Sequence, residues 1–337
     1  MITRAADKTT VTAQFASDVQ YYLSLLPRQL PSRYFYDDLG SALFDAICRL
    51  PWYGVTRAER RLLVGNGRQL LALVPGLTTI IELGPGNGEK LAALVEAGHA
   101  GAGHLDLRLV DISRAALELS SHLLSTLPNV NVSTYEAEYE AGLAAASAET
   151  RSGRALALFL GSNIGNFDRP GADEFLRSIR ASLMQGDMLL LGADLVKPER
   201  DLLLAYDDPL GVTAAFNRNL LVRINRELGG KFDVDRFAHR AIWSEAHSRV
   251  EMHLVSQGRQ RVTVDAANVD FVIEDEESIW TESSYKYTPA QIARALEQAG
   301  FKLVEQWIDE AGGFALTLSR LSSLPSEGYS SAAPTAR

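Results

Sequence analysis

The stretch Ile80-Ile81-Glu82-Leu83-Gly84-Pro85-Gly86-Asn87-Gly88-Glu89-Lys90 decides the fold. It joins an apolar run to a glycine-rich turn and then to a helical pattern, which predicts the first strand, turn and helix of a nucleotide-binding α/β domain. Glycine permits the tight turn and lets a ligand approach bare backbone N–H groups. The glycines read G-x-G-x-G, not the G-x-G-x-x-G of dinucleotide binders. We therefore expect Glu82, Gly84 and Gly86 to bind S-adenosyl-L-methionine rather than NAD; an ordinary strand-to-helix turn is the alternative.

Strands and helices alternate around this turn, which predicts a parallel sheet with helices on both faces. The expected strands are 78–83, 105–110, 155–160 and 188–195, with weaker pairing near 130–135. The expected helices are 88–98, 113–125 and 172–185. A helix over 289–299 and strands at 302–308 and 313–320 would complete this sheet with an antiparallel edge strand, an ending typical of the common methyltransferase sheet.

Residues 197–285 break the alternation and read as an insertion. Helices are expected near 199–206 and 209–226, and the alternating segments Arg249–Ser256 and Arg261–Ile273 are expected to pair antiparallel. The predicted fold is therefore α/β, a class I (Rossmann-like) methyltransferase sheet with an additional α+β substrate-binding domain. The expected division is a substrate-binding domain of residues 11–60 plus 197–285, a cofactor-binding methyltransferase domain of residues 61–196 plus 286–321, and a disordered tail at 322–337.

Composition narrows the class of protein. The 337 residues are 46% hydrophobic, enough for a sizeable core, and carry a net charge of −9. An acidic chain without a basic run argues against nucleic acid as a partner. The sequence shows no signal peptide and no run of about 18 apolar residues, so we expect a cytoplasmic monomer without a membrane span. The histidines and the single Cys48 lack metal-ligand spacing, so no metal is expected.

Polar residues follow two further strands of the predicted sheet, where ligands of open α/β sheets bind. Asp111 ends the second strand, where a carboxylate can accept hydrogen bonds from both hydroxyls of a ribose, although it could instead help to cap the next helix. Lys90 is placed to reach the carboxylate of the methionyl part, or to be solvated. Gly161 is expected beside the cofactor and Asn166 at the site, although asparagine is also an ordinary turn residue.

Several motifs together resemble one known family. The segments Tyr36–Phe44 (YDDLGSALF) and Phe159–Asn166 (FLGSNIGN) resemble signatures of the histidine-specific Nα-methyltransferases of ergothioneine biosynthesis. So do Ala205–Asp208, Arg249–Met252 and Thr281–Ser284, and the resemblance extends over roughly residues 15–320. It implies transfer of three methyl groups from S-adenosylmethionine to the α-amine of L-histidine, which yields hercynine.

The resemblance also implies residue roles. Tyr36 would lie near the reacting amine and the sulfonium, and the substrate-binding residues would be Asn166 and Tyr206 at the carboxylate, Tyr53, Glu282 and Ser284 at the imidazole, and Met252 beside the ring. Glu138 and Tyr139 stand where the family usually has an Asp-Phe pair on the adenine. We expect this departure to alter the affinity for the cofactor without abolishing it.

The residue chemistry supports histidine as substrate. Glu282 can accept from one imidazole N–H, and Ser284 can donate or accept at the other nitrogen. The plainer alternatives are a solvated charge for Glu282 and a core side chain for Met252. Rival functions are methylation of a tryptophan-like amino acid, cofactor binding without catalysis, an NAD-dependent oxidoreductase and metal-centred chemistry.

Overall fold

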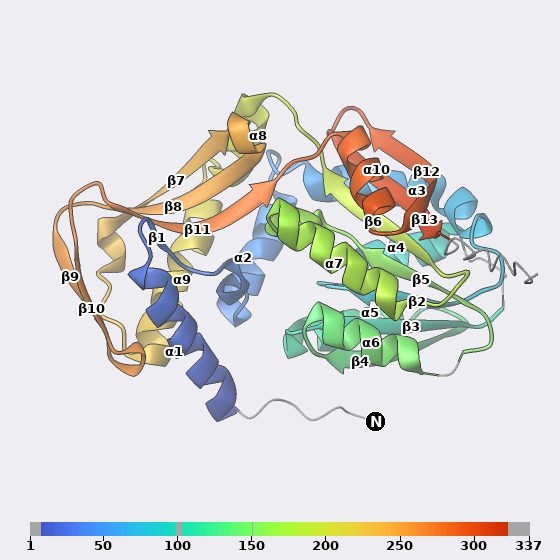
Figure 1. Cartoon of the computed structure of the whole chain (residues 1–337), viewed down its shortest axis with the longest axis horizontal. Helices are drawn as coiled ribbons and strands as arrows, with labels where there is room; N and C mark the ends of the chain where they lie inside the picture. Colours follow the sequence, from blue (N-terminus) through green and yellow to red (C-terminus); the bar gives the residue numbers. More distant parts are fainter. Residues whose placement is uncertain (1–7, 99–102, 150, 323–337) are drawn as a thin grey trace, which may run out of the picture.

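Two β-sheets lie side by side in the computed structural model of the chain, which describes residues 8–98, 103–149 and 151–322 (Figure 1). The larger sheet has seven strands in the order β12-β13-β6-β5-β2-β3-β4, and the smaller has four in the order β1-β11-β8-β7. A separate hairpin pairs β9 with β10. This arrangement confirms the predicted α/β sheet with an additional α+β region.

Five parallel strands form the body of the larger sheet, and all were predicted. They are β2 (Leu77–Leu83), β3 (Leu105–Asp111), β4 (Val130–Glu136), β5 (Arg154–Phe159) and β6 (Met188–Asp194). The weakly indicated segment near 130–135 is thus a full edge strand. The strand order reverses beside β2, which places the carboxyl ends of β2, β3 and β5 around one crevice.

Helices cover both faces of the larger sheet. One face carries α3 (Val55–Ala72), α4 (Glu89–Gly98) and α5 (Arg114–Leu124), and the other α6 (Tyr139–Ala148), α7 (Arg169–Ser182) and α10 (Pro289–Gln298). Side chains alternate along each strand, so Ile80 packs into the first core and Ile81 into the second. Helix α6 was not predicted, because its Ala-rich sequence has weak amphipathic periodicity.

The final hairpin corrects one prediction. Strand β13 (Phe314–Leu321) pairs antiparallel with β6, and β12 (Phe301–Asp309) pairs outside it. The antiparallel strand was therefore predicted correctly, but it lies one position inside the edge, and β12 is the edge strand.

The pairing expected within 197–285 was wrong. Strand β8 (Arg249–Ser256) pairs with β7 (Phe237–Ser244) and β11 (Ser278–Tyr285), not with residues 261–273. Those residues form their own hairpin from β9 (Gln260–Val264) and β10 (Val269–Ile273). The chain reverses at a short 3₁₀ turn that ends at Asn268, whose φ of 51° is left-handed. The fourth strand of the smaller sheet is the short β1 (Arg28–Gln29).

Four helices pack around the smaller sheet: α1 (Lys8–Ser24), α2 (Asp38–Arg49), α8 (Glu199–Tyr206) and α9 (Val212–Leu228). Asp37 fixes α2, because its Oδ1 accepts from the backbone N–H of Gly40 at 2.7 Å and from Asn219 Nδ2 at 2.8 Å. The first contact caps α2, and the second ties that cap to α9. This anchor positions the preceding residue, Tyr36.

The two sheets meet at a backbone seam where β11 ends. Tyr287 N–H donates to the carbonyl of Asp194 at 3.0 Å, and Val196 N–H donates to the carbonyl of Tyr287 at 3.0 Å. The tail predicted at 322–337 lies, apart from Ser322, outside the described residues. Within residues 8–98, 103–149 and 151–322, every helix is too short or too polar to cross a membrane.

Candidate active site

A wide cavity of about 330 Å³ opens at the carboxyl ends of β2 and β3. Its lining comes from the glycine turn, the end of β3, the starts of α5 and α6, and helix α2. The predicted cofactor residues Gly84, Gly86, Asp111 and Tyr139 all lie in this lining.

The glycine turn needs glycine for two separate reasons. Gly84, Gly86 and Gly88 have φ values of 73°, 56° and 80°, which is backbone that side chains disfavour. A Cβ on Gly84 would also lie 3.0 Å from Tyr139 Oη and 3.1 Å from Asn163 Nδ2. Any side chain at Gly84 would therefore crowd the cavity wall.

Asp111 fits a ligand that carries hydroxyl donors. Its Oδ1 accepts from the backbone N–H of Ser113 at 2.8 Å. Burial outweighs the backbone donors of Ser113 and Ile112 and raises the pKa of Asp111 to about 6. A buried carboxylate that is short of donors gains most from a vicinal diol such as a ribose, so the residues present fit the cofactor that the glycine turn predicts.

Glu82 and Lys90 line neither the wide cavity nor the narrow one. Glu82 is fully buried, its carboxyl oxygens have no hydrogen-bond partner among the described residues, and burial raises its pKa to about 8. Lys90 Nζ lies 3.0 Å from Glu59 Oε2, and Glu59 Oε1 accepts from Gly161 N–H at 2.8 Å. Glu59 was not predicted as a site residue, and it ties α3 and α4 to the loop after β5.

Two other predicted cofactor residues lie at the margins. The Glu138 side chain is 74% exposed and lies 3.7 Å from Arg33. Gly161 lines the neighbouring narrow cavity instead of the wide one. Their contacts with the cofactor stay predictions.

A narrow cavity of about 40 Å³ adjoins the wide one, between the two sheets. It gathers every predicted substrate residue, each from a different stretch of chain except the pair on β11: Tyr53, Asn166, Tyr206, Met252, Glu282 and Ser284. Met252 is 1% exposed, so its side chain belongs to the hydrophobic core and also lines the cavity.

The two cavities share part of their lining. Tyr36, Phe44, Asn163 and Asn166 line both of them. The Tyr36 ring lies edge-on to Phe44 at 5.6 Å and to Phe216 at 5.8 Å between centroids. Phe44 and Asn163 were not singled out from the sequence, although both belong to the quoted motifs.

The tyrosines of the narrow cavity are neutral. Burial, with the nearby Glu282 charge, raises the pKa of Tyr36 well above its ordinary value. Burial likewise raises the pKa of Tyr53. Burial also raises the pKa of Glu282 to about 7, and the charge of Lys286 limits that rise.

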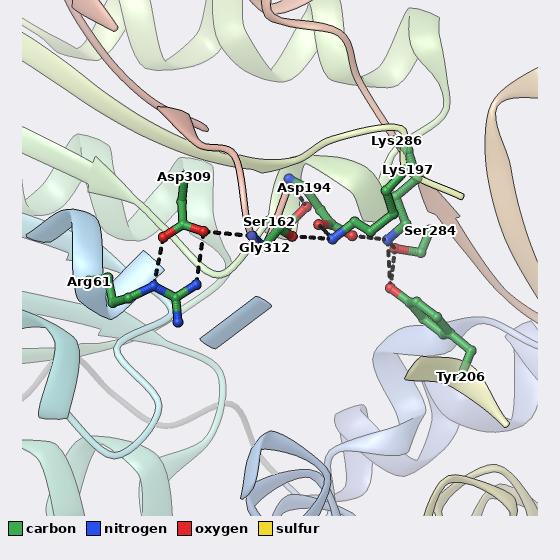
Figure 2. Close-up of polar contacts among 9 residues, drawn as sticks. All are labelled: Arg61, Ser162, Asp194, Lys197, Tyr206, Ser284, Lys286, Asp309 and Gly312. Carbon is green, nitrogen blue, oxygen red and sulfur yellow. Dashed lines mark hydrogen bonds and ion pairs between the residues drawn. The ribbon is translucent and has the colours of Figure 1, made fainter. Parts of the chain in front are cut away.

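A polar network lies behind the narrow cavity (Figure 2). Lys286 Nζ donates to Tyr206 Oη at 2.8 Å and to Ser284 Oγ at 3.0 Å, and lies 2.9 Å from Asp194 Oδ2. Asp194 Oδ1 accepts from Lys197 Nζ at 2.6 Å. Lys286 was not predicted, because nothing near it in the sequence marks its distant partners.

The sequence profile of a family described as "Histidine-specific methyltransferase, SAM-dependent" matches residues 15–321. The chain therefore belongs to this family of S-adenosylmethionine-dependent methyltransferases. It is 40% identical to the histidine N-alpha-methyltransferase of Mycobacterium tuberculosis, over 90% of this chain and 93% of that protein. It is 38% identical to the histidine N-alpha-methyltransferase of Mycolicibacterium smegmatis, with the same coverage.

More distant relatives act on other amines. A 4-dimethylallyltryptophan N-methyltransferase of Epichloe festucae var. lolii is 24% identical over 88% of this chain and 92% of its own length. The family assignment makes an NAD-dependent oxidoreductase the wrong interpretation of the glycine turn.

Proposed function

We propose that the protein transfers methyl groups from S-adenosylmethionine to the α-amine of L-histidine, in successive steps that yield hercynine on the route to ergothioneine. The observation that carries this proposal is the narrow cavity, which Glu282 and Ser284 line and which shares Tyr36 with the lining of the wide cavity. Membership of the histidine-specific family supports the same substrate.

The wide cavity would hold the cofactor, which supplies an activated methyl group when bound. Asp111 would accept hydrogen bonds from the ribose hydroxyls, and the backbone at Gly84 and Gly86 would lie against the ligand. Tyr139 would pack beside the adenine. Lys90, held by Glu59, would supply positive charge beneath the methionyl carboxylate.

The narrow cavity would hold histidine by both ends. Asn166 and Tyr206 would bind the carboxylate, while Glu282, Ser284 and Tyr53 would bind the imidazole. Hydrogen bonding at both ring nitrogens rejects an apolar ring, because the buried polar groups would then lose their partners. This discrimination against phenylalanine amounts to several kcal/mol, roughly 10⁴-fold or more.

Methyl transfer mainly requires alignment of the amine with the methyl group, which is a proximity effect. Tyr36 lies in the wall between the cavities, where its neutral hydroxyl would orient the amine and relay its proton to water. The rings of Tyr36 and Phe216 would also face the growing ammonium, worth about 0.5–2 kcal/mol by cation–π attraction.

The predicted division into two domains agrees with these roles. Residues 61–196 plus 286–321 would form the cofactor-binding domain, and residues 11–60 plus 197–285 the substrate-binding domain. Size-exclusion chromatography with light scattering tests the expected monomer.

Product analysis tests the function directly. Purified protein with S-adenosylmethionine is offered each of the common amino acids, and the products are identified by mass spectrometry. We expect histidine alone to gain up to three methyl groups, all on the α-nitrogen. Binding of the cofactor without methylation of histidine, or faster methylation of tryptophan, would contradict the proposal.

A further inference from the structure

Lys286 is a fully buried cation placed directly behind two hydroxyls of the narrow cavity (Figure 2). Its Nζ lies 2.9 Å from Asp194 Oδ2, 2.8 Å from Tyr206 Oη and 3.0 Å from Ser284 Oγ, so these three acceptors use its three N–H donors. Burial opposes its charge, but Asp194 and Tyr206 outweigh burial and raise the pKa of Lys286. The lysine therefore stays charged and has no donor left for a ligand.

The hydrogen bonds of Ser284 leave it a single way to contact a ligand. A serine hydroxyl has one hydrogen to donate and two lone pairs. Ser284 Oγ accepts from Lys286 at 3.0 Å and from the Tyr206 hydroxyl at 2.7 Å, which uses both lone pairs. When a carboxylate takes the Tyr206 hydrogen, one lone pair of Ser284 Oγ is freed. The Lys286 ammonium still occupies the other and still turns the Ser284 hydrogen away from its charge, so donation toward the cavity stays the favoured contact. Ser284 is therefore a donor toward the cavity.

We propose that Lys286 is a positioning residue that fixes Ser284 as a hydrogen-bond donor, so that the cavity binds histidine only with a neutral imidazole ring. The unprotonated ring nitrogen faces Ser284, and the ring N–H faces Glu282, which accepts it most strongly when ionised. This inference rests on the proposed function. It decides whether Ser284 donates or accepts at the imidazole nitrogen, which the sequence left open.

The other ionisable groups around Ser284 do not fix the direction of its hydroxyl hydrogen. Glu282 lies on the same face of β11 as Ser284. The hydroxyls of Tyr36 and Tyr53 are neutral. Lys197 contacts Oδ1 of Asp194, the oxygen that does not contact Lys286. Arg249 and Glu251 of β8 pair with Tyr285 and Ser283, so they lie on the opposite face of the sheet. Arg169 of α7 donates to the backbone carbonyl of Lys286, away from its ammonium.

Proton release on binding tests the inference. L-histidine is titrated calorimetrically at pH 6 into protein saturated with S-adenosylhomocysteine, in two buffers of different ionisation enthalpy. Most free histidine rings are protonated at this pH, because the ordinary imidazole pKa is about 6.5. Glu282, with a pKa of about 7, is also mostly protonated in the free protein. The parent protein is therefore expected to release up to about one proton from the ring when it binds histidine, and more where Glu282 ionises on binding.

Lys286→Met is expected to release fewer protons, by up to about one per histidine, because Ser284 can then accept from a second ring N–H. Lys197→Met is the matched control: it removes the other lysine on Asp194, contacts neither hydroxyl, and should release protons as the parent does. Affinity for S-adenosylhomocysteine, bound in the wide cavity, reports whether each variant is folded.

The outcomes separate the two proposals. Equal proton release from Lys286→Met and the parent, or no release from the parent, would overturn the inference and leave the proposed function standing. Failure of the parent to bind histidine would overturn the proposed function and this inference with it. If Lys286→Met does not bind S-adenosylhomocysteine as the parent does, Ser284→Ala replaces it, since Lys286 and Asp194 stay paired. Reduced proton release by Ser284→Ala then supports the donor polarity, and unchanged release refutes it.

Discussion

Glu282→Gln offers the most direct measurement of how the narrow cavity recognises its substrate. Glutamine keeps the shape of the side chain but removes the charge that accepts the imidazole N–H. A hydrogen bond to a charged group contributes about 1.5–3 kcal/mol, so the dissociation constant for histidine should rise about 10- to 150-fold at pH 8.

The pH dependence of histidine affinity tests the same prediction in a second way. Burial raises the pKa of Glu282 to about 7, so the carboxyl is ionised and accepts at pH 8 but holds its proton at pH 5.5. Affinity of the parent protein should therefore fall as the pH drops through about 7, in addition to the loss from protonation of free histidine. Glutamine does not titrate, so the gap between variant and parent should narrow toward pH 5.5.

Calorimetry with S-adenosylhomocysteine present measures both effects. Glu251→Gln is the matched control, because Glu251 pairs with Arg249 and His253 on the opposite face of the smaller sheet. Its affinity for histidine should equal that of the parent. A Glu282→Gln dissociation constant within about threefold of the parent at pH 8 would refute recognition by a charged acceptor, for which a loss of at least about tenfold is expected.

Three further changes test other parts of the site. Asp111→Asn should weaken binding of S-adenosylhomocysteine about 10- to 150-fold at pH 8 in a fluorescence titration, since a charged acceptor is lost, and parent affinity should itself decline below about pH 6, the pKa of Asp111. Tyr36→Phe should slow methylation while dissociation constants for cofactor and histidine stay near those of the parent; parent rates for all methylation steps would show that Tyr36 plays no part. Gly142→Ala should lower the melting temperature, because the new Cβ would lie 2.1 Å from Val110 Cγ1 and overpacking costs about 1–3 kcal/mol, against about 1 kcal/mol gained in helix propensity. An unchanged melting temperature would show that α6 can shift on β3 without loss.

The parts of the fold that sequence predicts are those whose signals are local. The apolar run, glycine turn and helix of residues 80–90 carry their own signature, and the structure places them as β2 and α4. The hairpin β9–β10 was misjudged because Arg261–Ile273 was interpreted as one alternating segment, although the alternation changes phase at Ala266-Ala267, where the chain turns. The left-handed backbone at Asn268 completes the reversal, and asparagine alone is too common in other settings to predict it.

The site shows the same limit. Family-like motifs led to the residues that line the narrow cavity, yet they did not lead to Lys286, two positions beyond Ser284. Its partner Tyr206 lies 80 residues away, and the contact with Asp194 arises only when β11 meets β6. Glu59 was missed for a similar reason, since its carboxylate binds the backbone of Gly161, 102 residues away. Buried polar contacts of this kind depend on the tertiary structure and cannot be predicted from a short segment of sequence.

The backbone seam at Asp194, Val196 and Tyr287 has a mechanical consequence. Main-chain hydrogen bonds join the two sheets there, so the end of β11 is held against the end of β6. The Lys286–Asp194 ion pair lies beside this seam, whereas helix α2 lies in the lining of the wide cavity. Under the proposed function, a partly methylated amino acid in the narrow cavity would be held beside the seam, apart from the wide cavity in which one cofactor replaces another.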